Sequence, residues 1–317
     1  MIGVVGAGAF GTALAVTWAR AGSDVVLWGR NTEAMAAAQS LRALPCLPGV
    51  TLPDKIHATA DPGHLDDCAT LVLAVPTQFL PDVLTTLPAF SASHIVAACK
   101  GVDLRSLQGP TTTIAQAYPQ AVTAILSGPS FATDIAAGLP TALSLGCEND
   151  AVGASLQAAL STPTIRLYRT QDVTGVELGG ALKNVIAIAC GAAIGAGLGD
   201  SARAALMTRG MAEIMRLAAA MGARRDTLMG LSGLGDLALT CASPASRNFA
   251  LGMALGRGEP LPDATTEGVA TADAALRLAT ERDLDLPVTQ AVSGLVAGRL
   301  TVKDAMTDLL TRDLKTE

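Results

Sequence analysis

Aromatic residues and runs of positive charge are scarce in this chain. Only 3% of its 317 residues are aromatic although half are hydrophobic, so aliphatic side chains and alanine must form the core, with 32 glycines allowing close packing. The net charge is −6 and no stretch is rich in lysine or arginine. This balance argues against a nucleic acid or an anionic membrane surface as a partner.

Paired cysteines and a long apolar segment are also missing. The six cysteines contain no C-x-x-C pair, and most lie in apolar runs such as the one that ends at Cys99. This pattern predicts buried, reduced thiols in a cytoplasmic protein, with no disulfides and no metal site. Because a strand is predicted from residue 2, no signal peptide is expected. The most apolar stretch, Val185–Gly199, is too short and too glycine-rich to predict a membrane span.

The chain opens with an apolar strand, Ile2–Val5, that runs into the glycine-rich sequence Gly6-Ala7-Gly8-Ala9-Phe10-Gly11. In a dinucleotide-binding fold, Gly6 would permit the tight turn, Gly8 would let the backbone approach a pyrophosphate, and Gly11 would let the next helix pack on the strand. A helical pattern and a second strand follow, as that fold requires. The alternative is an ordinary glycine-rich turn of an α/β protein.

The first half of the chain alternates apolar runs with helical patterns, whereas the second half shows helical patterns alone. The expected strands are Ile2–Val5, Asp24–Trp28, Ile56–Thr59, Thr70–Val75, His94–Ala98, Ala121–Leu126, Thr141–Leu145 and Ile165–Tyr168. The long helices expected after them are 173–196 and 201–221, the second with Asp200 or Ser201 as N-cap. We therefore predict an α/β fold: a Rossmann-type, doubly wound and mostly parallel sheet in residues 1–170, and an all-helical domain in residues 171–317.

The end of the second strand bears on the choice of nucleotide. An NAD-binding fold usually carries an acidic residue there, which accepts hydrogen bonds from the adenosine ribose. Asp24 begins the strand and so lies at the wrong edge, while Arg30 follows its end. A guanidinium suits a 2′-phosphate, so the sequence predicts that NADPH is used at least as well as NADH. The alternative is a solvated surface arginine.

Reduction of a carbonyl by hydride also needs a proton donor, often a histidine. The three histidines all fall in the sheet domain, and His94 begins its strand, away from the edge where ligands bind. Two lysines are better candidates. Lys100 ends an apolar strand, and Lys183 interrupts an apolar helix, where burial would lower the pKa of an ammonium toward the working range of a catalyst. The alternative for Lys183 is a structural lysine whose ammonium reaches solvent.

Three polar clusters complete the set of candidates. Asp236 follows Gly233-Leu234-Gly235 and is either a ligand-binding carboxylate or a helix cap. Ser246-Arg247-Asn248 stands at a predicted helix start and would suit a substrate phosphate, or would form an ordinary capped helix. Ser127-Gly128-Pro129-Ser130-Phe131 follows a strand and is placed for ligand contact.

These motifs, taken in order, resemble one family over nearly the whole chain. They are GAGAFG at the start, Leu27-Trp28-Gly29-Arg30, Cys99-Lys100-Gly101, Ser127-Gly128-Pro129-Ser130-Phe131-Ala132, Glu177-Leu178-Gly179-Gly180-Ala181-Leu182-Lys183-Asn184-Val185, Gly233-Leu234-Gly235-Asp236-Leu237 and Ser246-Arg247-Asn248. The chain resembles the bacterial NAD(P)-dependent glycerol-3-phosphate dehydrogenases.

The resemblance implies an oxidoreductase that interconverts dihydroxyacetone phosphate and sn-glycerol 3-phosphate with NADP or NAD, supplying glycerophospholipid biosynthesis. It implies that Lys183 is the catalytic proton donor and acceptor. The residues that would bind the phosphorylated substrate are Lys100, Gly128, Ser130, Lys183, Asp236, Ser246, Arg247 and Asn248. The residues that would bind the cofactor are Gly6, Gly8, Ala9, Phe10, Gly11, Arg30, Lys100, Ala132, Arg247 and Glu267. The family also suggests a homodimer.

The sequence departs from the family pattern at three places. Relatives often carry serine at Ala9 and a bulkier or basic residue near Asn31, and the segment around Glu267 matches only loosely. Two other functions stay open at this stage. One is another two-domain NADP-dependent reductase, of the β-hydroxyacid or ketopantoate type, and the other is a non-catalytic NADPH-binding sensor.

Overall fold

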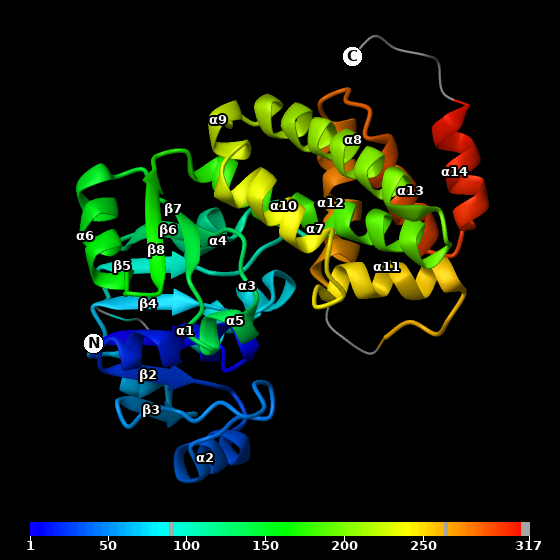
Figure 1. Ribbon diagram of the computed structural model, residues 1–317. Helices are drawn as coiled ribbons and strands as arrows, with labels where there is room; N and C mark the ends of the chain where they lie inside the picture. The colour runs from blue at the N-terminus through cyan, green and yellow to red at the C-terminus, as the bar shows by residue number, and fades with distance from the viewer. Residues whose placement is uncertain (89, 91, 263–265, 312–317) are drawn as a thin grey trace. The chain divides into compact units, whose positions relative to one another are not determined.

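The computed structural model describes residues 1–88, 90, 92–262 and 266–311. The chain forms two compact units (Figure 1). The sheet unit comprises Met1–Lys100 and Gln108–Glu177, and the helical unit comprises Gly101–Leu107 and Leu178–Glu317. The short segment Gly101–Leu107 therefore groups with the helices, although it leaves the sheet unit directly after Lys100.

The sheet unit is built on one eight-stranded sheet with the order β3-β2-β1-β4-β5-β6-β7-β8 (Figure 1). The strands are β1 (Ile2–Val5), β2 (Val25–Trp28), β3 (Ile56–Thr59), β4 (Thr70–Leu73), β5 (His94–Ala97), β6 (Val122–Ser127), β7 (Thr141–Gly146) and β8 (Ile165–Thr170). All neighbouring pairs are parallel except β6 and β7. The predicted mostly parallel, doubly wound sheet is confirmed, and its order reverses between β1 and β4, where such folds bind ligands.

The register brings the ends of the central strands to one edge. Val5 pairs with Trp28 on one side and with Leu73 on the other, and Leu73 pairs in turn with Ala97. The segments that follow β1, β2, β4 and β5 therefore leave the sheet at the same edge. This edge is the carboxyl edge, at which the candidate ligand-binding residues of the sheet unit were predicted.

Helices cover the sheet and bury its aliphatic side chains. They are α1 (Ala9–Arg20), α2 (Thr32–Leu41), α3 (Leu80–Thr86), α4 (Pro110–Ala117), α5 (Ala132–Ala136) and α6 (Asp150–Leu160), with short 3₁₀ turns at Pro62–Leu65 and Thr77–Phe79. The two sides of the sheet form separate clusters. One is built around Val4, Leu14 and Trp18, and the other around Val5, Leu71 and Ile95. Alternate residues of β1 thus serve opposite faces, as expected for a strand buried on both sides.

The described part of the helical unit contains helices and no strand, as predicted. Its helices are α7 (Val173–Gly195), α8 (Gly199–Ala220), α9 (Arg225–Leu228), α10 (Asp236–Thr240), α11 (Arg247–Arg257), α12 (Glu267–Thr280), α13 (Pro287–Val296) and α14 (Val302–Leu310), and a π-helical turn at Leu231–Gly235 precedes α10. α7 begins in the sheet unit and continues into the helical unit. It is long and apolar enough to cross a membrane, but 89% of its apolar window is buried inside the protein. This burial is typical of the core helix of a globular fold.

Six of the eight strands differ from their predicted bounds by one or two residues, and two details of the helical unit also differ from the sequence predictions. α8 begins at Gly199 with Leu198 as N-cap, so the predicted caps Asp200 and Ser201 lie within its first turn. In this turn Asp200 interacts favourably with the positive end of the helix dipole, and it pairs with Arg203 at 3.0 Å. The α9 helix and the π-helical turn were not predicted, because segments of four and five residues carry too little periodicity to detect.

Candidate active site

The glycine turn after β1 has the geometry of a dinucleotide cradle. Gly6 has a φ of +116°, which favours glycine, and a Cβ on Gly11 would lie 2.1 Å from the Gly6 carbonyl oxygen. A Cβ on Gly8 would meet no atom within 4 Å, so the space above this residue is open. Gly8 is also the N-cap of α1 and supplies no side-chain cap. The first turn of α1 can therefore present its N–H groups to a phosphate.

Arg30 is exposed just beyond the end of β2, at the carboxyl edge. Its neighbour Asn31 accepts a hydrogen bond from the Ala34 N–H at 2.8 Å and caps α2. This cap gives the asparagine a structural role at this position. Asp24 lies at the opposite end of β2 and pairs with Lys55 at 3.7 Å, away from the carboxyl edge.

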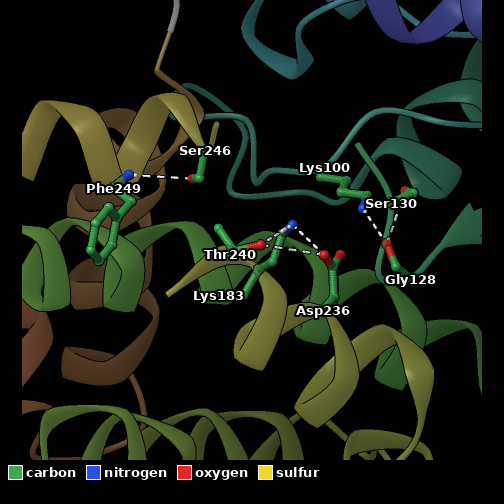
Figure 2. A network of polar contacts seen from close by, with 8 residues as sticks. All are labelled: Lys100, Gly128, Ser130, Lys183, Asp236, Thr240, Ser246 and Phe249. Carbon is green, nitrogen blue, oxygen red and sulfur yellow. Dashed lines mark hydrogen bonds and ion pairs between the residues drawn. The ribbon is translucent and has the colours of Figure 1, made fainter. Parts of the chain in front are cut away.

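Lys100 connects two segments of the sheet unit. Its ammonium donates a hydrogen bond to the Gly128 carbonyl at 3.0 Å and lies 5.9 Å from the centre of the Phe10 ring, in the glycine turn. Ser130 donates to the same Gly128 carbonyl at 3.1 Å (Figure 2). Three positions assigned by resemblance to the substrate therefore meet at one carbonyl group. Ala132, assigned to the cofactor, begins α5 just after them.

Lys183 lies in a buried polar cluster of the helical unit. Its ammonium donates to Asp236 Oδ1 at 2.5 Å and to Thr240 Oγ1 at 2.8 Å (Figure 2). The Thr240 hydroxyl also lies 3.4 Å from Asp236 Oδ1. Lys183 is 6% exposed, Thr240 is 2% exposed and Asp236 is fully buried. The lysine therefore does not reach solvent as a structural lysine would, and a carboxylate compensates its charge inside the protein.

Two glycines bring Asp236 to Lys183. A Cβ on Gly179, one turn before Lys183, would lie 2.7 Å from the Ser232 carbonyl oxygen, so the π-helical turn packs directly on α7. A Cβ on Gly233 would lie 1.9 Å from the Leu228 carbonyl oxygen, so that turn itself depends on glycine. π-helical turns are often found at functional sites. Here the turn delivers Asp236 as the first residue of α10.

Thr240 was not among the predicted site residues. The signal that could have identified it is its spacing, because residues four apart share one face of a helix and Thr240 follows Asp236 by four. Cys241 comes next and is buried. A hydrogen bond with Cys190, together with burial, raises the pKa of the Cys241 thiol. This thiol therefore stays protonated and is unsuited to act as a nucleophile.

The cluster at the start of α11 combines one exposed and two buried side chains. Arg247 is exposed at the first position of the helix. Ser246 accepts a hydrogen bond from the Phe249 N–H at 3.3 Å and caps the helix (Figure 2). Asn248 accepts from the Gly268 N–H at 3.0 Å, next to Glu267 at the start of α12. The arrangement leaves Arg247 as the charged group available to an anion.

Most of the remaining thiols match the expected pattern. Cys46 is exposed, Cys68, Cys99, Cys147, Cys190 and Cys241 are buried, and none of the six forms a disulfide. Within the described ranges, no group of three or more histidine, cysteine, aspartate or glutamate side chains could hold a metal ion.

Comparisons with known proteins agree with this architecture. Two family models cover most of the chain: the NAD-dependent glycerol-3-phosphate dehydrogenase N-terminus matches residues 1–153 and the C-terminus matches residues 172–307. The glycerol-3-phosphate dehydrogenase [NAD(P)+] of Ruegeria sp. (strain TM1040) is 54% identical over all of this chain and 99% of its own length. That of Paracoccus denitrificans (strain Pd 1222) is 52% identical with the same coverage.

Solved structures separate the two reductase alternatives. A crystal structure of glycerol-3-phosphate dehydrogenase from Coxiella burnetii superimposes with a TM-score of 0.92 at 35% identity and covers 98% of both chains. A ketopantoate reductase from Ralstonia eutropha JMP134 reaches a TM-score of 0.62 at 16% identity over 96% of this chain and 99% of its own, and shares only the fold. The open glycine cradle and the uncapped start of α1 also fit a nicotinamide dinucleotide. The chain therefore belongs to the NAD-dependent glycerol-3-phosphate dehydrogenase family, whose members use NAD or NADP.

Proposed function

We propose that this chain interconverts dihydroxyacetone phosphate and sn-glycerol 3-phosphate, with Lys183 as the proton donor in reduction and the proton acceptor in oxidation. The observation that carries the proposal is the buried ammonium of Lys183, held by Asp236 and Thr240 in the helical unit. The family membership of the chain supports the same reaction. The product is the backbone of glycerophospholipids, so the reaction supplies their biosynthesis.

The roles of the residues follow from their chemistry. The Asp236 carboxylate pairs with the Lys183 ammonium at 2.5 Å and would hold it in place for proton transfer. The Thr240 hydroxyl fixes the direction of the Lys183 side chain by accepting a second hydrogen bond. Protonation of the carbonyl oxygen by Lys183 would balance the negative charge that develops there during reduction.

The substrate phosphate would be bound by cations and helix ends. Arg247 is the exposed guanidinium at the start of α11 and would pair with the phosphate. Lys100, oriented by the Gly128 carbonyl, would add a second positive charge. Ser130, Ser246 and Asn248 would contribute polar contacts.

The cofactor would lie on the glycine turn. Its pyrophosphate fits the open space above Gly8 and the N–H groups at the start of α1. Gly6 and Gly11 shape this turn, and Arg30 would favour the 2′-phosphate of NADPH. The further residues proposed to contact the cofactor are Ala9, Phe10, Lys100, Ala132, Arg247 and Glu267. When bound, the nicotinamide supplies or accepts the hydride.

A single assay tests the reaction. NADPH oxidation should be followed with dihydroxyacetone phosphate and, in parallel, with ketopantoate and a β-oxo acid. Of these three substrates, we expect only dihydroxyacetone phosphate to be turned over. Turnover only with an oxo acid would favour the other reductases, and NADPH binding without turnover of any of the three would favour a sensor. The proposal also includes a cytoplasmic location and a homodimer. Size-exclusion chromatography with light scattering would test the homodimer.

A further inference from the structure

The α12 helix begins without a cap of its own. Its N-cap residue, Thr266, makes no side-chain cap hydrogen bond. The N–H of Gly268, the second residue of the helix, is instead bound by Asn248 Oδ1 of α11 at 3.0 Å, in a buried position. An N-cap side chain normally satisfies this N–H group or the next one. Asn248 therefore caps α12 from another helix.

Two other helices of the chain are capped in the same way. Glu177 accepts the Thr111 N–H at the start of α4 at 2.7 Å, and Glu213 accepts the Val288 N–H at the start of α13 at 2.6 Å. The N-cap residues of α4 and α13 also lack a side-chain cap of their own. A cap from a distant residue ties two helices together in addition to satisfying the backbone. Asn248 differs from these two caps because both helices that it joins, α11 and α12, carry residues assigned to the active site.

The contact at Gly268 also involves α7. A Cβ on Gly268 would lie 2.7 Å from the Asn184 carbonyl oxygen and 2.8 Å from Asn248 Oδ1. Only glycine fits here without displacing backbone, so the first turn of α12 is pressed against α7 at the residue that follows Lys183. The starts of α11 and α12 thus meet α7 at one buried point.

We propose that Asn248 is a positioning residue for the cofactor, because its cap holds the first turn of α12, and with it Glu267, in place against α7. This role differs from the direct contact with substrate that the family resemblance implies for Asn248. It rests on the proposed function, which assigns Glu267 to the cofactor. The amide oxygen of Asn248 serves α12, and the NH₂ group of the same side chain can donate hydrogen bonds.

The test is a fluorescence titration of the substrate-free protein with NADPH. Asn248→Leu keeps the approximate shape of the side chain and removes the acceptor, and should raise the Kd for NADPH between about three-fold and thirty-fold, the range expected for loss of a cap. Asn248→Asp keeps the acceptor oxygen and should bind NADPH more tightly than Asn248→Leu, while its KM for dihydroxyacetone phosphate rises. An Asn248→Leu protein that binds NADPH within two-fold of wild type would overturn the proposal. So would an Asn248→Asp protein that binds it as weakly as Asn248→Leu.

Hydrogen exchange of the α12 amides provides the structural readout and guards against misfolding. Asn248→Leu should speed exchange in the first turn of α12 and leave the rest of the helix protected. Thr301→Ala is the matched control, since it removes the local cap of α14 and should change neither the α12 exchange nor the Kd. Faster α12 exchange with an unchanged Kd would also overturn the proposal, because the cap would then serve the fold alone. The titration contains no ketone, so its result is independent of whether dihydroxyacetone phosphate is the substrate.

Discussion

The two units present their polar groups in different ways. The sheet unit offers main-chain groups at strand ends, such as the turn at Gly8, the start of α1 and the Gly128 carbonyl. The helical unit offers side chains: Lys183 is buried and held by Asp236, and Arg247 is exposed at the start of α11. Main-chain groups persist when a neighbouring side chain changes, whereas a buried ion pair depends on both of its members. Substitutions in the two units should therefore have unequal effects.

This contrast explains which departures from the family pattern the chain can tolerate. Ala9 is the first residue of α1, and its main-chain N–H group would be the same if the residue were serine. A comparable change at Asp236 would leave the ammonium of Lys183 buried without its carboxylate. Breaking such a pair is expensive, because the remaining charge has lost its water and its partner.

The largest effect is expected from removing the buried ammonium of Lys183, on which the polar cluster of the helical unit depends. Lys183→Met should lower kcat for reduction of dihydroxyacetone phosphate by at least about 10²-fold, the usual contribution of a general acid, while the Kd for NADPH stays within two-fold of wild type. Steady-state kinetics and an NADPH titration measure the two quantities. Lys303→Met, which removes an exposed lysine of α14, is the control and should leave both unchanged. Near-wild-type turnover by the Lys183→Met protein would show that the proton comes from elsewhere.

A smaller effect is expected at Glu213, where the helical unit uses a buried side chain for its own stability. The carboxylate accepts hydrogen bonds from the N–H groups of Val288 and Thr289 at 2.6 and 3.0 Å. Glu213→Gln directs an amide NH₂ toward these donors and should lower the free energy of unfolding by about 1–3 kcal/mol. Urea unfolding measures this loss, and Glu281→Gln, at an exposed glutamate, is the control.

The difference in stability between the wild-type and Glu213→Gln proteins should depend on pH. Burial raises the pKa of the Glu213 carboxyl, although its hydrogen bonds oppose the shift. A raised pKa in the folded state means that the folded protein binds more protons than the unfolded chain between the two pKa values. The contribution of Glu213 should therefore be complete below the unfolded pKa and decline as the pH rises through the folded one. A wild-type advantage over Glu213→Gln that grows with pH across this window would contradict the assignment.

The sequence identifies the functional residues of each unit better than it identifies their partners. Lys183 was found because it interrupts an apolar helix, and Asp236 because glycines flank it. Their pairing could not be predicted, since they are 53 residues apart and meet only because Gly179 lets the π-helical turn approach α7. In the sheet unit, by contrast, the parallel register alone predicts that Lys100 follows its strand to the ligand edge. Contacts set by regular hydrogen bonding can be predicted from sequence patterns, and contacts set by packing distances cannot.

The smallest effect is expected at Arg30, the exposed side chain proposed to bind cofactor in a unit that otherwise offers mostly main-chain groups. If its guanidinium pairs with the 2′-phosphate, Arg30→Ala should lower the ratio of kcat/KM for NADPH to that for NADH by about three-fold to ten-fold, since solvent weakens an exposed pair. Steady-state kinetics with both cofactors at one salt concentration measure the ratio, and Arg166→Ala, at an exposed arginine of β8, is the control. An unchanged ratio would mean that the Arg30 side chain does not bind the 2′-phosphate, and that main-chain groups account for phosphate binding at the ends of β1 and β2. A reduced ratio would mean that the Arg30 side chain binds the 2′-phosphate. Main-chain groups would then account for binding of the pyrophosphate only.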